Sequence, residues 1–193
     1  MMVKYRDHQK DRAFVLIGGC SRSGKTTLSK EIEQDLNREG IASAIINLDN
    51  WLMGIDERSG KETVRERYHY EKIERDIRKL QAGYPIHPPV YDPRTRLIIS
   101  RSRAGAINLS GGGIGIVDGT IALDIEALRK IALFKIFVEV EDKVRFDRLM
   151  RFYVEFKGCN LDETFSIIQS REKEEVRIIK ETKPYADVIY VSQ

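Results

Sequence analysis

The feature that most constrains the fold is a glycine-rich stretch that directly follows a short apolar run. Residues 19–26 read Gly-Cys-Ser-Arg-Ser-Gly-Lys-Thr, which fits the G-x-x-x-x-G-K-[ST] pattern. The apolar run before it, Ala13 to Ile17, predicts a buried strand. Lys25 to Glu39 has helical spacing and stops at Gly40. A strand, a glycine-rich loop and a helix in this order predict a phosphate-binding loop, whereas a chance glycine turn is the alternative.

The chemistry of such a loop explains its spacing. Glycines let the backbone curl until successive N–H groups point inward at an anion, and the helix aims its positive dipole end at the same place. Lys25 can reach the β- and γ-phosphates, and the Thr26 hydroxyl can bind Mg²⁺. We therefore expect ATP and Mg²⁺ as cofactors. The expected nucleotide contacts are Gly19, Cys20, Ser21, Arg22, Ser23, Gly24, Lys25, Thr26 and Thr27. Cys20 is either a redox-sensitive thiol or a small residue that fills the loop.

Alternation of apolar runs with helical patterns predicts one α/β domain of the P-loop NTPase fold, with a parallel five-stranded sheet flanked by helices. The predicted strands are Ala13 to Ile17, Ala42 to Leu48, Ile114 to Val117, Phe134 to Val140 and Val188 to Val191. The predicted helices are Lys25 to Glu39, Tyr70 to Ala82, Asp124 to Ala132, Asp142 to Phe156 and Leu161 to Thr182.

Residues 84–110 interrupt this alternation. They hold four of the five prolines and then two β-like runs, Leu97 to Ser100 and Ala106 to Leu109. We expect these runs to form a small antiparallel hairpin inserted beside the main sheet. The hairpin is also a candidate dimer surface, so a homo-oligomer is left open.

Composition excludes several classes of protein. The 193 residues suit one domain, and the net charge of +3 is too balanced for a nucleic-acid binder. Two cysteines are too few for a disulfide scaffold, and no apolar run approaches the roughly 18 residues of a membrane helix. The first residues lack the apolar core of a signal peptide. We expect a cytoplasmic protein that binds neither membrane nor nucleic acid.

Two aspartates follow predicted strands, at the edge of the sheet where ligands of parallel sheets bind. Asp118 closes the run Ile114 to Val117, as the metal-holding aspartate of such proteins does, although strands often end in aspartate. Asp49 follows the run that ends at Leu48. It is a candidate base that orients the acceptor hydroxyl, with a solvated turn aspartate as the alternative.

Motifs that are missing narrow the function further. The chain has no N-K-x-D segment for guanine recognition, and Gly119 follows Asp118 where hydrolytic ATPases usually carry glutamate. Both facts favour transfer of a phosphoryl group to a bound acceptor over hydrolysis.

Residues 145–160 are a candidate lid. Arg145, Arg148 and Arg151 recur at intervals of three on a predicted helix. Arg148 and Arg151 are candidate catalytic cations that stabilise the transferring group, whereas a solvated helix face is the alternative. Trp51, two residues past Asp49, either stacks on the substrate or anchors its loop.

These residues resemble the uridine kinase and phosphoribulokinase family of P-loop kinases, from Phe14 to Val191. The resemblance rests on the phosphate loop 18–27, Asp49, Pro89-Val90-Tyr91-Asp92, Val117-Asp118-Gly119 and Thr182-Lys183-Pro184-Tyr185-Ala186-Asp187. It implies that Asp49 is the base, that Arg148 is a lid arginine with Arg151 a looser match, and that Tyr91 lines the acceptor pocket.

The chain departs from this family on the acceptor side. Arg96 replaces the family's base-contacting histidine, and Lys157-Gly158-Cys159-Asn160 replaces a second arginine cluster. Arg94 and Arg96 either suit an acceptor that bears a phosphate or carboxylate or lie exposed on a hairpin tip. Three functions follow as hypotheses: a uridine-kinase-like enzyme, a kinase of a sugar, sugar phosphate or vitamin precursor, and a nucleotide-dependent regulatory ATPase.

Overall fold

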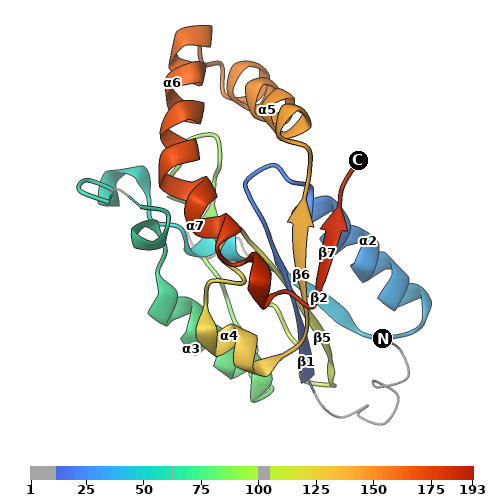
Figure 1. The fold of residues 1–193 in the computed structure, drawn as a ribbon. Helices are drawn as coiled ribbons and strands as arrows, with labels where there is room; N and C mark the ends of the chain where they lie inside the picture. Colours follow the sequence, from blue (N-terminus) through green and yellow to red (C-terminus); the bar gives the residue numbers. More distant parts are fainter. Residues whose placement is uncertain (1–11, 62, 100–104) are drawn as a thin grey trace.

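The computed structural model describes residues 12–61, 63–99 and 105–193. Its centre is a five-stranded sheet in the order β2-β5-β1-β6-β7, in which every neighbouring pair is parallel. The strands are β1 (Arg12–Gly18), β2 (Ser43–Asn47), β5 (Gly113–Asp118), β6 (Ala132–Glu139) and β7 (Val188–Val191). The predicted P-loop fold with its parallel sheet is confirmed (Figure 1).

Helices cover both faces of the sheet. The α-helices are α2 (Lys25–Arg38), α3 (Tyr70–Gln81), α4 (Glu126–Ile131), α5 (Asp142–Arg151), α6 (Leu161–Arg171) and α7 (Arg177–Lys180). Short 3-10 turns are η2 (Leu48–Trp51), η3 (Ile55–Glu57), η4 (Arg65–Arg67) and η8 (Lys183–Tyr185). The π-helical turns η6 (Phe152–Phe156) and η7 (Glu172–Val176) extend α5 and join α6 to α7. The predicted helix over 161–182 therefore contains a π-turn in its middle, a feature frequent at functional sites.

Successive side chains of β1 point to opposite faces of the sheet and pack into a hydrophobic core on each side. Phe14 and Leu16 face the cluster that includes Ile73 and Ile77 of α3, whereas Val15 and Ile17 face Leu28 of α2. Strand residues 14–17 are at most 1% exposed, as expected for a central parallel strand covered on both faces. Each such side chain stabilises the fold by about 2 kcal/mol through burial. The core thereby fixes the end of β1, from which the phosphate loop departs.

The insertion pairs differently from the prediction. β3 (Val90–Tyr91) pairs antiparallel with β4 (Ile98–Ile99), and a single bridge joins Ile86 to Ile107. The predicted small antiparallel hairpin within residues 84–110 is therefore confirmed, but β3 takes the place of the run Ala106 to Leu109 as the partner of β4. A tight turn explains the observed pairing, because Asp92 accepts hydrogen bonds from the amide of Arg94 at 2.8 Å and the hydroxyl of Thr95 at 2.7 Å. Residues 100–104 lie outside the described residues.

No helix in the described part of the chain has the length and apolar character needed to cross a membrane.

Candidate active site

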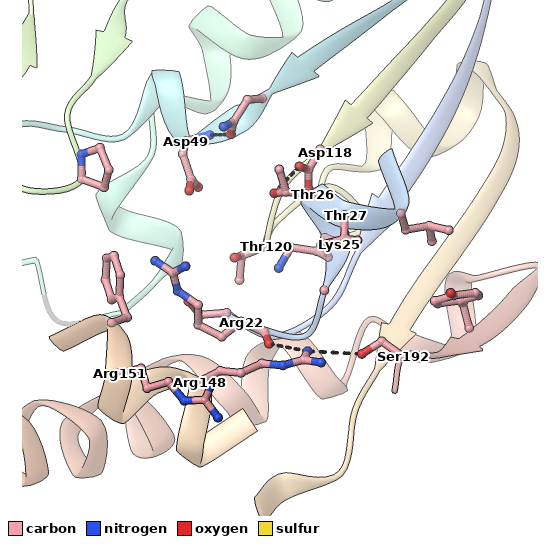
Figure 2. Close-up of a pocket in the computed structure, with 18 of the residues that line it drawn as sticks. Arg22, Lys25, Thr26, Thr27, Asp49, Asp118, Thr120, Arg148, Arg151 and Ser192 are labelled. Carbon is pink, nitrogen blue, oxygen red and sulfur yellow. Dashed lines mark hydrogen bonds between the residues drawn. The ribbon is translucent and has the colours of Figure 1, made fainter. Parts of the chain in front are cut away.

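Three segments meet at the carboxyl edge of the sheet because their strands are parallel. The phosphate loop follows β1, Asp118 ends β5, and Asp49 follows β2. They line one cavity of about 1410 Å³. Of the predicted site residues, those that line it are Ser21, Arg22, Gly24, Lys25, Thr26, Thr27, Asp49, Asp118, Arg148 and Arg151. Figure 2 shows Asp49, Thr26 and Asp118 on one side of this space, and Arg148 and Arg151 on the other.

Backbone geometry explains the glycines of the phosphate loop. Gly19 has φ of 139° and Gly24 has φ of 102°, a region that favours glycine. A Cβ atom at Gly19 would also collide with the carbonyl oxygen of Val138 in β6. Arg22 adopts φ of 65° without being glycine. The loop is therefore a strained, closely packed turn whose helix, α2, begins at Lys25.

Lys25 is held over this loop. Its side chain is 8% exposed, and Nζ donates a hydrogen bond of 2.8 Å to the carbonyl oxygen of Cys20. Cys20 is itself buried, and burial is the main cause that raises the pKa of its thiol to about 11. Such a thiol is poor as a nucleophile, so its position fits the packing alternative for Cys20 better than the redox alternative.

Asp118 and Thr26 offer paired oxygen atoms. The Thr26 hydroxyl donates to Oδ2 of Asp118 at 2.7 Å, and Asp118 is 2% exposed. Burial raises the pKa of Asp118, opposed by the positive charge of Lys25 and the hydrogen bond from Thr26, while the nearby Asp49 raises it further. A divalent cation would relieve this unfavourable burial of charge. A carboxylate and a hydroxyl are also the hard oxygen ligands that suit Mg²⁺, so these residues fit the metal.

Asp49 is oriented from two sides. Its backbone N–H donates to Oδ1 of Asn47 at 2.9 Å, and its carboxylate accepts a hydrogen bond of 2.9 Å from the hydroxyl of Tyr68. Burial, and then the charge of Asp49, hold the pKa of Tyr68 well above its usual range, so this hydroxyl remains a donor. Sequence reasoning missed Tyr68, because a lone bridge between Leu52 and Tyr68 brings it to Asp49 and no motif marks it.

The other predicted acceptor residues take different places. Trp51 is 1% exposed, and its indole Nε1 donates to Oδ2 of Asp76 at 3.1 Å. Its position fits the anchoring alternative and does not fit stacking on a substrate. Tyr91 is half-buried, and its hydroxyl accepts from Arg58 at 3.0 Å. Arg96 is half-buried with φ of 62°, whereas Arg94 is exposed.

The three arginines of α5 that were predicted to form a stripe divide into two groups. Arg148 and Arg151 line the cavity, and Arg148 donates to the carbonyl oxygen of Arg22 at 3.3 Å and to the hydroxyl of Ser192 at 3.3 Å. Arg145 is 6% exposed and forms an ion pair with Glu172 instead. The three arginines therefore do not lie on one exposed face of α5, because the start of η7 covers the face that carries Arg145.

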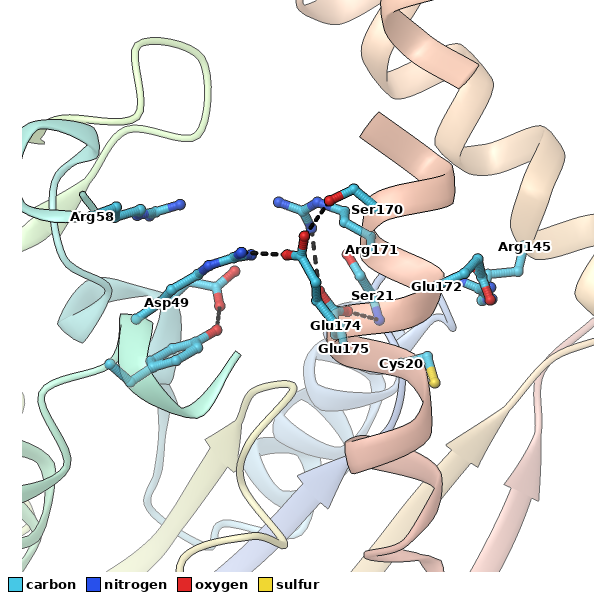
Figure 3. A network of polar contacts seen from close by, with 12 residues as sticks. Cys20, Ser21, Asp49, Arg58, Arg145, Ser170, Arg171, Glu172, Glu174 and Glu175 are labelled. Atoms are coloured by element: carbon cyan, nitrogen blue, oxygen red, sulfur yellow. Dashed lines mark hydrogen bonds and ion pairs between the residues drawn. The ribbon is translucent and has the colours of Figure 1, made fainter. Parts of the chain in front are cut away.

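The phosphate loop contacts the π-helical turns η6 and η7 directly. The guanidinium group of Arg22 lies 3.5 Å from the centre of the Phe152 ring. In addition, the amide of Ser21 donates to the Glu175 carboxylate at 3.2 Å, as Figure 3 shows. The phosphate loop therefore contacts residues that lie 126 to 154 positions further along the chain.

Comparison with known proteins agrees with this geometry. The sequence model described as "Phosphoribulokinase / Uridine kinase family" matches residues 14–192. A uridine kinase of Lactococcus lactis subsp. cremoris is 28% identical over 187 residues, covering 93% of this chain and 88% of its own.

Among solved structures, a kinase assigned provisionally to a fructose transport system of Silicibacter sp. TM1040 aligns with a TM-score of 0.79 at 20% identity. The alignment covers 94% of this chain and 91% of that one. A possible uridine kinase from Bacillus stearothermophilus aligns with a TM-score of 0.67 at 22% identity, covering 93% and 89%. At these identities the two structures show the shared fold.

Proposed function

The chain belongs to the phosphoribulokinase/uridine kinase family of P-loop kinases, and from this premise we propose that it transfers the γ-phosphate of ATP to a hydroxyl group of a small molecule, with Asp49 as the base. The observation that carries the proposal is that the phosphate loop, Asp49 and two lid arginines line a single cavity. A base within the same cavity as the triphosphate is the arrangement that direct transfer to an acceptor requires.

In this proposal the loop residues 19–27 hold the phosphates. Their backbone amides and the start of α2 attract the anion, and Lys25 neutralises charge at the β- and γ-phosphates. Arg148 and Arg151 approach the transferring group from the lid, where positive charge stabilises the developing negative charge. We assign residues 145–160 to the lid.

Mg²⁺ would be held by Thr26 and Asp118. When bound, the cation would neutralise charge on the phosphates. The two residues supply oxygen atoms to it, and Ser29 and Lys25 of the same helix help to fix Asp118 electrostatically.

Asp49 would accept the proton of the acceptor hydroxyl. Proton acceptance by a positioned carboxylate contributes about 10² to 10⁴ in rate. The hydrogen bond from its own amide to Asn47 fixes the backbone of Asp49, and the one from Tyr68 holds its carboxylate. Tyr68 acts through Asp49, so it is a positioning residue.

Two classes of acceptor are candidates. The name of the uridine kinase relative supports a nucleoside. The half-buried cations near Asp49 support an acceptor that already bears an anionic group, such as a sugar phosphate or a carboxylated vitamin precursor. The third hypothesis, a regulatory ATPase, needs no acceptor at all.

The first test measures Mg²⁺-dependent release of ADP from ATP with and without uridine, for the wild type and for Asp49→Asn. Stimulation by uridine that vanishes in the variant supports a nucleoside kinase. ATP binding without stimulation rules out the nucleoside and directs the search to anionic acceptors. Acceptor-independent release that Asp49→Asn leaves unchanged contradicts the kinase proposal and favours the regulatory ATPase.

A further inference from the structure

We propose that four cationic side chains beside Asp49 hold an anionic group of the acceptor, a phosphate or a carboxylate: Arg58, Arg96, Lys157 and Arg171. The inference rests on the proposed function, because it concerns the acceptor of the same reaction. It excludes an uncharged nucleoside as the preferred acceptor. We refer to these four residues as the cationic cluster.

The cluster is assembled from four separate segments. Arg58 follows η3, Arg96 lies in the turn between β3 and β4, Lys157 follows η6, and Arg171 ends α6. All four side chains are half-buried. Lys157 and Arg171 both lie beside the Tyr153 ring, and Figure 3 shows Arg58 facing Arg171. The backbone of Arg96 is tied to the segment before Arg58, because its carbonyl oxygen accepts a hydrogen bond of 2.9 Å from the N–H of Ile55. The charges of the three arginines also lower the pKa of Lys157. Because its members come from four segments, the cluster is not a row of charges along one exposed helix face.

Arg58 is fixed in direction without being neutralised. Its Nε and Nη2 donate to the carbonyl oxygen of Met53 at 3.0 and 2.8 Å, and Nη2 also donates to the Tyr91 hydroxyl at 3.0 Å. These acceptors carry no formal charge. Figure 3 shows the guanidinium groups of Arg58 and Arg171 pointing toward one another near Asp49. Arg58 therefore presents a positioned positive charge to this space.

Lys157 and Arg171 approach the same aromatic ring. Lys157 Nζ lies 5.5 Å and the Arg171 guanidinium 5.8 Å from the centre of the Tyr153 ring. A ring face attracts one cation weakly, by about 0.5 to 2 kcal/mol, and it does not cancel the repulsion between two. The shared ring therefore places the two cations side by side without neutralising Lys157.

Among the four cations, Arg171 is balanced by a carboxylate, because it pairs with Glu175 at 3.4 Å. The positive charge in excess belongs to the other three. In the part of the chain that the structure describes, no ion pair joins Arg58, Arg96 or Lys157 to a carboxylate. Burial, followed by the charges of Arg96 and Arg171, lowers the pKa of Lys157 to about 8. An anion bound in the cluster would remove this repulsion.

The position of the cluster indicates which substrate it serves. Figure 3 shows Asp49 close to the guanidinium groups of Arg58 and Arg171, which come from segments outside the phosphate loop. Arg148 and Arg151, by contrast, line the cavity with the phosphate loop. An acceptor anchored by its anionic end in the cluster would place a hydroxyl toward Asp49. Positioning of this kind is how a charged clamp contributes to catalysis.

The test uses the full chain saturated with Mg²⁺ and a non-hydrolysable ATP analogue, so that the phosphate loop is filled. Lysines are labelled by reductive methylation near neutral pH, and the rates at Lys157 and Lys143 are followed by peptide mass spectrometry. The probe anions are methyl phosphate and acetate. Lys143, exposed on α5, is the internal control. We expect a bound anion to slow labelling of Lys157 about fivefold, because it favours the protonated amine, and to leave Lys143 unchanged.

Protection by methyl phosphate alone indicates a phosphorylated acceptor, and protection by acetate indicates a carboxylated one. Arg58→Gln should remove most of the protection. Equal rates with and without both anions, equal slowing of Lys143, or full protection in Arg58→Gln would each overturn the proposal. Labelling needs no phosphoryl transfer. Selective protection in an inactive enzyme therefore contradicts only the proposed function, and activity without protection contradicts only the anion site.

Discussion

The hydroxyl of Tyr68 lies 2.9 Å from Oδ1 of Asp49 and donates a hydrogen bond to it. We expect Tyr68→Phe to lower kcat about tenfold, which corresponds to ~1.4 kcal/mol, because the carboxylate loses a positioning partner. The KM for ATP should stay unchanged, since Tyr68 does not line the nucleotide side of the cavity. Steady-state kinetics with a competent acceptor check this.

Tyr70→Phe is the matched control for that variant. Its hydroxyl donates to Asp124 at 2.8 Å, away from Asp49. The same loss of one hydroxyl should leave kcat at the wild-type value. Equal loss of kcat in both variants would show that the effect comes from general damage to this segment.

Asp118→Asn should raise the thermal midpoint of the protein at neutral pH when nucleotide and Mg²⁺ are absent. Burial raises the pKa of Asp118, so the buried charge opposes folding at every pH above that raised pKa, and the penalty disappears as pH falls below the ordinary value. Asparagine removes the charge and keeps an acceptor for the Thr26 hydroxyl. Calorimetry from acidic to neutral pH should show the difference from wild type shrinking as pH falls.

The same variant should lose the extra stabilisation that Mg²⁺ gives in the presence of ATP. A midpoint that still rises with Mg²⁺ as in wild type would remove Asp118 from the metal site.

Arg145→Met should destabilise the fold by about 2 kcal/mol, because it removes the buried partner of an ion pair whose other member, Glu172, is exposed. Urea unfolding measures the change. The double variant Arg145→Met/Glu172→Met should recover part of the loss, as expected for two residues that interact. If the effect of the double variant on the free energy of unfolding equals the sum of the two single effects, Arg145 and Glu172 do not interact, and their ion pair does not link α5 to η7.

Gly19→Ala should abolish nucleotide binding or folding, since φ of 139° is strained for alanine and the new Cβ would collide with Val138. A penalty of roughly 2 kcal/mol or more is expected from the strained backbone alone. Gly111→Ala is the control, because a Cβ there meets nothing within 4 Å. Binding of a fluorescent ATP analogue and circular dichroism separate loss of the site from loss of the fold.

Local patterns were enough to predict the framework of the molecule. The glycine spacing before Lys25 and the apolar runs ending near Asp49 and Asp118 are encoded by neighbouring residues, and parallel strands bring their ends together. The pairing of β3 with β4 was missed, because strands of two residues show no periodicity and the Asp92 turn decides their register.

Features that depend on distant contacts could not be predicted. Tyr68 reaches Asp49, and Glu172 covers Arg145, only after the chain has folded. Trp51 looked equally suited to a substrate or to the core, and its hydrogen bond with Asp76 from α3 places it in the core. The cationic cluster likewise draws its members from four segments with no common motif.

The central place of β1 in the sheet has a consequence for biosynthesis. Its two partners are β5, which begins at Gly113, and β6, which begins at Ala132. A growing chain thus carries the apolar run Phe14 to Ile17 with both edges unpaired until β5, and then β6, have left the ribosome. Pairing across such separations is slow and leaves the strand open to aggregation. A chaperone that shields this run would therefore act after β1 has been synthesised and before the chain reaches β5.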